Sequence, residues 1–171
     1  MPRSYTISAF TENTPGVLQR LTIIFSRRKV NIDSLTVSET ETKGISRFTI
    51  VISVEPDLIQ KLAKQLNRII EVVDVFVAEN HDLLYREIAF FKVATASPRE
   101  RAELEELAHR YGAIVTLAKD SYLVIEKTGT EEQINSLFLL LEPYGMKEFV
   151  RSGRIAIANR ERTPNEMFLT R

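Results

Sequence analysis

The residues Asn13-Thr14-Pro15-Gly16 combine groups that can bind a small charged molecule where a helix begins. Gly16 has no Cβ atom, so a ligand can approach the backbone closely, and the N–H groups of a helix start suit a carboxylate or a phosphate. A free amino acid fits this mixture, because Asn13 offers both a donor and an acceptor, while Val17 or Leu18 offers an apolar wall. The same tetrapeptide is also ordinary turn and cap chemistry, and composition alone leaves that alternative open.

The helix that follows Gly16 differs from the other predicted helices in its first turn. Its opening residues carry no side-chain anion, although Glu12 lies just upstream. The other three predicted helices carry carboxylates that neutralise the positive end of the helix dipole. These carboxylates belong to Asp57, Glu100, Glu131 and Glu132. We therefore expect the backbone amides of the first helix to be available to a ligand.

The first half of the chain predicts one βαββαβ unit, which is complete by about residue 79. Apolar residues alternate in the predicted strands and recur at helical spacing in the predicted helices. Thr14 is a candidate cap with Pro15 in the first helical turn, and Pro56 opens the second helix. In order, we expect a strand at 4–11, a helix from Pro15 to about Lys29, strands at 31–39 and 45–54, a helix from Pro56 and a strand at 72–77.

The second half repeats the same order of elements. Ser97 and Thr130 each begin a capping-box pattern, which predicts the start of a helix. The expected strands are 88–95, 113–117, 122–126 and 148–157, the last interrupted near Ser152-Gly153. The fold class is therefore α+β, with two ferredoxin-like βαββαβ domains at residues 1–79 and 80–158. Residues 159–171 are polar and lack periodicity, so we expect a mobile or partner-bound tail there.

The composition excludes several classes of function. With 23 basic and 23 acidic residues, the chain has no net charge and no long-range field to attract nucleic acid or an anionic membrane. The absence of cysteine removes disulfides and thiolate chemistry, and it fits a reducing compartment. No apolar run approaches the ~18 residues that a bilayer-spanning helix requires. We expect a cytoplasmic protein that contacts neither nucleic acid nor membrane.

Residues suited to catalysis are scarce in this chain. An active site needs an activated nucleophile or a poised acid–base pair. His81 lies in a polar linker and His109 on a helix, and both are expected at the surface. The sequence contains no metal-binding H-E-x-x-H, P-loop or G-x-G-x-x-G motif. We expect no catalytic residues, no metal site and no cofactor in this chain.

Several ordered segments resemble one protein family. Residues 13–18 look like the opening of an ACT domain, a small-molecule sensor of amino-acid metabolism. Residues 25–37 and 46–51 resemble the hallmark segments of acetolactate (acetohydroxyacid) synthase regulatory small subunits. The segments 65–75, 86–88 and 148–156 are similar to stretches found in that order in the same family. The resemblance covers nearly the whole chain and agrees with the two-domain pattern, which was derived separately.

The resemblance implies an N-terminal ACT domain that forms a homodimer, with effector sites at the dimer interface. In such a site, one protomer would contribute Asn13 and the backbone of Pro15, Gly16, Val17 and Leu18, and the other would contribute Asn31 and Ile32. From the residues alone, Asn31 is equally a polar turn residue. The implied effector is a branched-chain amino acid (valine, leucine or isoleucine), most simply valine.

The resemblance also implies a separate catalytic large subunit as the partner. That subunit would carry thiamine diphosphate, magnesium and FAD, while this chain would stimulate and feedback-regulate it in branched-chain amino acid biosynthesis. Two alternatives remain open from the sequence. One is a stand-alone amino-acid sensor that acts on another enzyme or on a transcription factor. The other is an RNA-binding module, which needs paired aromatics on the middle strands and a basic surface, whereas Phe48 is the only aromatic in the strand expected at 45–54 and the net charge is zero.

One position departs from the family pattern. The family usually has glycine where this chain has Lys29, just after the first helix, where a left-handed backbone suits glycine best. Lysine in that conformation costs ~1 kcal/mol unless the helix ends differently. The position of the following Asn31 depends on which of these occurs.

Overall fold

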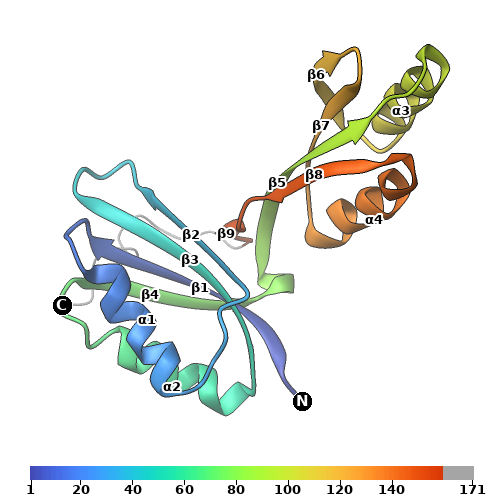
Figure 1. Ribbon diagram of the computed structural model, residues 1–171. Helices are drawn as coiled ribbons and strands as arrows, with labels where there is room; N and C mark the ends of the chain where they lie inside the picture. Colours follow the sequence, from blue (N-terminus) through green and yellow to red (C-terminus); the bar gives the residue numbers. More distant parts are fainter. Residues whose placement is uncertain (160–171) are drawn as a thin grey trace. The chain divides into compact units, whose positions relative to one another are not determined.

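The computed structural model of the 171-residue chain describes residues 1–159, and it divides into two compact units (Figure 1). The first unit comprises Met1–Tyr85 together with the chain from Arg154 onward, and the second comprises Arg86–Gly153. This division differs from the expected domains 1–79 and 80–158. The last described strand returns to the first unit, and the strand that links the units runs through the boundary without a break. The expected tail lies outside the described residues after residue 159.

The first unit is a four-stranded antiparallel sheet with two helices. Its strands have the order β2-β3-β1-β4, and β1 pairs with both β3 and β4. The elements are β1 (Arg3–Glu12), α1 (Val17–Arg27), β2 (Ser34–Glu39), β3 (Ile45–Val54), α2 (Pro56–Leu66) and β4 (Val72–Glu79), followed by the short η1 (Asn80–Asp82). This arrangement confirms the predicted βαββαβ order.

The core of the first unit lies between the sheet and its two helices. Ile7 and Ile50 point from the central strands toward Leu21 and Phe25 of α1 and Leu62 of α2, and all five side chains are almost completely buried. Burying such side chains contributes roughly 1.5–3 kcal/mol each. This apolar layer fixes the position of α1 on the sheet and therefore the position of its first turn.

The second unit repeats the architecture with the strand order β6-β7-β5-β8. Its elements are β5 (Leu83–Ala94), α3 (Pro98–Arg110), β6 (Ile114–Lys119), β7 (Tyr122–Gly129), α4 (Glu131–Leu141), η2 (Glu142–Tyr144) and β8 (Met146–Arg151). The core again lies between sheet and helices, where the Phe149 ring contacts Phe91 at 5.1 Å and Phe138 at 5.0 Å between centroids. The predicted ferredoxin-like fold is confirmed for this unit as well.

The two predicted capping boxes differ in their geometry. At Thr130, both reciprocal hydrogen bonds with Gln133 are formed, so this box is complete. At Ser97, the hydroxyl accepts from the amide of Glu100, but the Glu100 carboxylate accepts from the amide of Ala96 instead of that of Ser97. In both helices the N-cap side chain satisfies an amide of the first turn that has no intrahelical partner.

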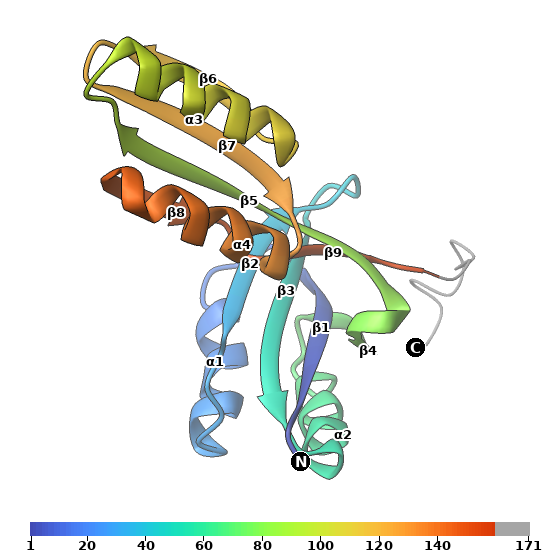
Figure 2. The ribbon, with the colours of Figure 1, turned by 90° about the vertical axis from the view of Figure 1, so that its right-hand side faces the viewer.

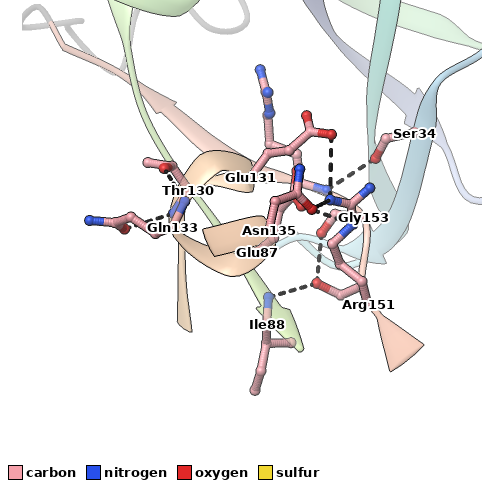
Figure 3. Close-up of polar contacts among 11 residues, drawn as sticks. Ser34, Glu87, Ile88, Thr130, Glu131, Gln133, Asn135, Arg151 and Gly153 are labelled. Carbon is pink, nitrogen blue, oxygen red and sulfur yellow. Dashed lines mark hydrogen bonds and ion pairs between the residues drawn. The ribbon is translucent and has the colours of Figure 1, made fainter. Parts of the chain in front are cut away.

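A polar cluster holds the end of the second unit against its first strand (Figure 3). The Arg151 guanidinium lies 3.5 Å from the buried Glu87 carboxylate, 3.4 Å from Glu131 and 3.3 Å from the Asn135 side-chain oxygen. Beside it, the Ser152 amide donates to the Ile88 carbonyl at 2.8 Å, and the Ser152 hydroxyl accepts from the Ile88 amide at 3.0 Å. These contacts define where β8 ends and where the chain leaves this unit.

The chain then returns to the first unit as β9 (Ile155–Ala158), which pairs with β5 (Figure 2). Arg154 is only 3% exposed, and its guanidinium donates to Thr6 Oγ1 at 3.0 Å and to Asn80 Oδ1 at 2.7 Å. The guanidinium also lies 3.8 Å from the centroid of the Tyr85 ring, within cation–π range. The predicted interruption near Ser152-Gly153 is therefore confirmed, and it is the point at which the chain changes units.

Arg154 and β9 together, residues 154–158, are called the return segment below. This segment accounts for buried polar side chains in β1 that the alternation of its residues does not predict. Thr6 and Ser8 lie on the sheet face away from the helices, yet each is only 1% exposed. Arg47 donates to Ser8 Oγ at 2.9 Å and also to the carbonyl of Ala156. The outer face of the first sheet is thus polar and is satisfied by the chain's own C-terminal segment.

Helix α1 ends in a left-handed residue, as expected for this position. Lys29 has φ +54° and is the one non-glycine residue with positive φ in the described chain. Its amide donates to the Ser26 carbonyl at 3.0 Å, and the Val30 amide donates to the Phe25 carbonyl at 3.0 Å. This pair of bonds is the Schellman motif, so the helix does not end differently to avoid the strain. The position of Asn31 is therefore set by the same turn that glycine would form.

Lys29→Gly should stabilise the protein by about 1 kcal/mol, because glycine removes the left-handed strain and loses only part of the gain to unfolded-state entropy. The measurement is chemical denaturation followed by circular dichroism. Arg28→Gly is the matched control, since Arg28 has φ −95° and gains nothing from glycine. A stabilising effect in both variants, or in neither, would contradict the assignment of strain to Lys29.

Arg154→Ala should lower the stability of the first unit by about 2–4 kcal/mol, because two hydrogen bonds from a charged group and a cation–π contact are lost. Arg110→Ala, which breaks an exposed ion pair with Glu106 on α3, should change stability by less than about 1 kcal/mol. Calorimetry checks both variants. If the two substitutions had equal effects, Arg154 would not anchor the return segment.

Candidate functional site

The start of α1 is formed by a turn that differs from the one expected at Thr14. The helix begins at Val17, and its N-cap is Gly16 with φ +86°, a left-handed conformation that favours glycine. Thr14 is therefore not the cap, and Pro15 precedes the helix instead of occupying its first turn. The turn is tied to the sheet because the Asn13 amide donates to the Gly44 carbonyl at 2.8 Å.

The first turn of α1 has no side-chain anion, as predicted. No acidic residue lies in this turn, and no side chain caps it. The Arg20 amide donates to the Gly16 carbonyl at 3.1 Å, which is the first turn of the intrahelical ladder, and the amides before Arg20 have no carbonyl one turn earlier in the helix. The amides of the preceding residues therefore point out from the positive end of the helix dipole, which favours an anionic ligand.

Arg20 is a residue of this region that the sequence analysis missed. Its guanidinium lies 2.6 Å from the Glu71 carboxylate and within 3.5 Å of the Pro15 carbonyl. A Cβ atom added at Gly16 would lie 3.4 Å from Arg20 Nη1, so the guanidinium borders the turn directly. The sequence signal that could have indicated Arg20 is its spacing from Gly16. A side chain four residues further along a helix points back toward the helix start.

These groups can accept a zwitterion. The α1 amides and Arg20 attract a carboxylate, while Glu71 and the Asn13 side chain offer oxygens to an ammonium group. Of the two expected apolar walls, Val17 is buried in the core, whereas Leu18 is 44% exposed. Leu18 is therefore the side chain that a ligand at this surface would meet.

Asn31 and Ile32 lie at the opposite end of α1. The helix has 11 residues, so its ends are about 16 Å apart at 1.5 Å per residue. The Asn31 side chain donates to Asp33 Oδ1 at 3.2 Å, and Ile32 packs against the core. Strand β2 begins only at Ser34, so both residues lie in the loop that precedes it. One chain does not bring the two halves of the expected site together.

Other chemistry is not evident in the part of the chain that the structure describes. Residues 1–159 contain no grouping of three or more His, Asp or Glu side chains that could hold a metal ion. His81 and His109 are exposed, as predicted. Within the same residues, no helix is long and apolar enough to cross a membrane.

The fold and the helix start define the class of protein. The first unit is a βαββαβ domain, which is the architecture of an ACT domain, and its first helix begins at an exposed turn without a side-chain anion. Residues 7–74 match the family model described as an AHAS small subunit-like ACT domain. Residues 86–160 match the model described as the small subunit of acetolactate synthase.

The chain belongs to the family of acetolactate synthase small subunits. It is 41% identical over 148 residues to the acetolactate synthase small subunit of Bacillus subtilis, covering 85% of each chain. It is 39% identical over 155 residues to that of Mycolicibacterium smegmatis, covering 91% of each chain. The crystal structure of the acetolactate synthase small subunit from Thermotoga maritima superposes with a TM-score of 0.85 at 28% identity, over 93% of this chain and 99% of that one. Membership of this family supports a regulatory role.

Proposed function

We propose that this chain binds a branched-chain amino acid, in the first instance valine, and thereby stimulates and feedback-regulates a catalytic acetolactate synthase large subunit. The observation that carries the proposal is the anion-free start of α1, bordered by Arg20 and Leu18. A free amino acid supplies the carboxylate and the aliphatic side chain that these groups match. Family membership supports the large subunit as the partner, and that subunit would carry the thiamine diphosphate, magnesium and FAD.

The amino acid would bind between two copies of the first unit. Asn31 and Ile32 lie a helix length from Gly16 in one chain, so they can contact the same small ligand only from a second copy. Strand β2 is an edge of its sheet, and Val37 on it is exposed. Unpaired strand edges present backbone groups that can pair with another chain. Homodimerisation through this edge would supply the missing half of the site.

Regulation then follows from differential binding. An effector that binds at the interface of two first units favours the dimer arrangement that binds it best. Coupling of this kind is reciprocal. If the effector changes the affinity of this chain for the catalytic subunit by a given factor, the catalytic subunit changes the affinity of this chain for the effector by the same factor. The chain has no cysteine and therefore no disulfide that a reducing compartment would break. We propose the cytoplasm as its location.

The RNA-binding alternative is not favoured by the aromatic residues. Phe48 is buried in the core between sheet and helices, so it does not offer a stacking platform. The outer face of this sheet is occupied by the return segment, with Arg47 and Arg154 already bonded to protein groups. Single-stranded RNA recognition requires exposed aromatics on such a face.

Gly16→Asp and Gly16→Asn form a matched pair that tests the site. In both variants the backbone of residue 16 must stay left-handed, a conformation that Asn and Asp tolerate better than most other residues with a side chain. The Asn and Asp side chains also have nearly the same shape, so the two variants differ mainly in charge. The Asp carboxylate can occupy the helix start and pair with Arg20, so we expect it to lower valine affinity at least about tenfold relative to Asn. Isothermal titration of valine into each variant measures this difference. Equal affinities would remove the helix start from the site.

The catalytic partner is tested by enzyme activity. Addition of this chain to the large subunit should raise acetolactate formation, and valine should then reduce it in a saturable way. Gly16→Asp should still raise activity but respond to valine only at higher concentration. Binding of valine without any effect on the large subunit would favour the stand-alone sensor, and a pull-down from the native extract would then identify its target.

A further inference from the structure

The helices of the two units differ in the sign of their charges. Residues 13–32, which contain α1, carry four basic side chains and no acidic one, and residues 58–70, which contain most of α2, carry three basic side chains and no acidic one. Helix α3 instead carries four glutamates and three arginines, and two of these arginines form ion pairs with glutamates on the same helix. The helix layer of the first unit is therefore basic within a chain that has no net charge.

Three arginines of this layer line one hollow between α1 and α2, which cover the same face of the first sheet (Figure 1). Arg27 is the last residue of α1, and Arg28 is its C-cap. Arg68 follows the C-cap of α2. The hollow has a volume of about 260 Å³, and its lining is completed by Ile24 and Gln65. Basic side chains from the ends of two helices thus border one small space.

The guanidinium groups at this hollow are not paired with other groups of the described chain. Within residues 1–159, no hydrogen bond or ion pair joins the guanidinium of Arg27, Arg28 or Arg68 to a protein group. Arg20, on the same helix layer, is instead paired with Glu71 at 2.6 Å. Like charges that share one hollow repel one another, and a bound anion would offset this repulsion. The arrangement therefore favours an anionic ligand.

The number of arginines favours a phosphate monoester over a carboxylate. A guanidinium presents a planar fork of N–H donors that matches the oxygens of either group. A carboxylate has two oxygens and a single negative charge, so it would satisfy one arginine. A phosphate monoester has three free oxygens and a charge of about −1.5 to −2 at pH 7, so it can bridge arginines from both helices. A phosphodiester has only two free oxygens and a single charge.

The size of the hollow indicates a small molecule. Its volume of about 260 Å³ lies below the roughly 300–1,000 Å³ of pockets that bind drug-sized ligands. Beside the arginines, Ile24 is half-buried and offers an apolar contact. The Gln65 side-chain amide offers both a donor and an acceptor. These two residues suit the part of a metabolite that carries the phosphate.

We propose that the hollow between α1 and α2 binds a small metabolite with a phosphate monoester group. Arg27, Arg28 and Arg68 surround the phosphate, and Ile24 and Gln65 contact the remainder of the molecule. The hollow involves the end of α1, whereas the proposed amino-acid site involves its start and Leu18. The two sites use different side chains, so either proposal can fail without the other.

NMR titration of the full chain tests the ligand chemistry through the arginine Nε–H signals, in chloride buffer at about pH 7.5, where phosphate is mostly doubly charged. Inorganic phosphate and methyl phosphate should shift the signals of Arg27, Arg28 and Arg68 in a saturable way. Arg110 on α3, which is paired with Glu106, should not respond. Dimethyl phosphate and acetate should bind at least about tenfold more weakly. Equal binding of dimethyl phosphate would indicate recognition of a phosphodiester backbone, and equal binding of acetate would indicate general anion attraction; either result would overturn the proposal.

A set of arginine variants tests the site itself by the same titration with methyl phosphate. Arg28→Gln and Arg68→Gln each remove one exposed guanidinium and should weaken binding at least about tenfold. Arg68→Lys keeps the charge but loses the planar fork, so it should retain part of the affinity. Arg110→Gln removes a charge from the second unit and is the matched control, with unchanged binding expected. Unchanged binding in Arg28→Gln and Arg68→Gln, or an equal loss in Arg110→Gln, would show that the proposal is wrong. Valine affinity of Arg68→Gln should equal that of the unmodified chain, which keeps this test separate from that of the amino-acid site.

Discussion

The proposed function of this chain depends on a helix dipole that the protein leaves without a side-chain counter-charge in the first turn. Helix α1 begins at a left-handed glycine, has no acidic residue in its first turn and has Arg20 beside it. Every other α-helix in the described chain carries a carboxylate in its first turn. The Arg20 guanidinium is paired with Glu71 at 2.6 Å, and the chain as a whole has no net charge, so the α1 dipole is a local feature. In the proposed function, a small anion would bind at this one turn and not at the surface at large.

Much of this arrangement could be predicted from sequence, because it depends on local rules. Helical periodicity and proline positions predicted the element order, and of the two helix ends left open at Lys29 the structure has the left-handed one. The cap at Thr14 was wrong because a glycine with positive φ two residues later can start the helix without a side-chain cap. Arg20 was missed because its role depends on Glu71, which comes from a loop 51 residues further along the chain. Long-range pairing of this kind leaves no periodic signal.

The two units show how one fold supports different surfaces. Both place apolar side chains between sheet and helices, so their cores obey the same pattern. Their outer faces differ because Thr6 and Arg47 are bonded to the chain's own C-terminal segment, with Ser8 accepting from Arg47, whereas Phe90 and Val150 are exposed apolar side chains. The alternation of the strands could be predicted, but not which sheet the last strand would join. That assignment depended on Arg154, whose partners Thr6 and Asn80 are distant in sequence.

The return of β9 makes the second unit an insertion within the first. Thr6 and Arg154 are separated by 148 positions, so their hydrogen bond closes a loop that contains almost the entire chain. During synthesis on a ribosome, the N-terminal unit cannot complete its outer layer until the C-terminal segment has emerged. The helices and strands of the inserted unit have all been synthesised before Arg154, so this unit has no such delay. A chain that stopped before Arg154 would therefore leave the Thr6 and Ser8 hydroxyl groups, which are buried in the complete fold, open to solvent.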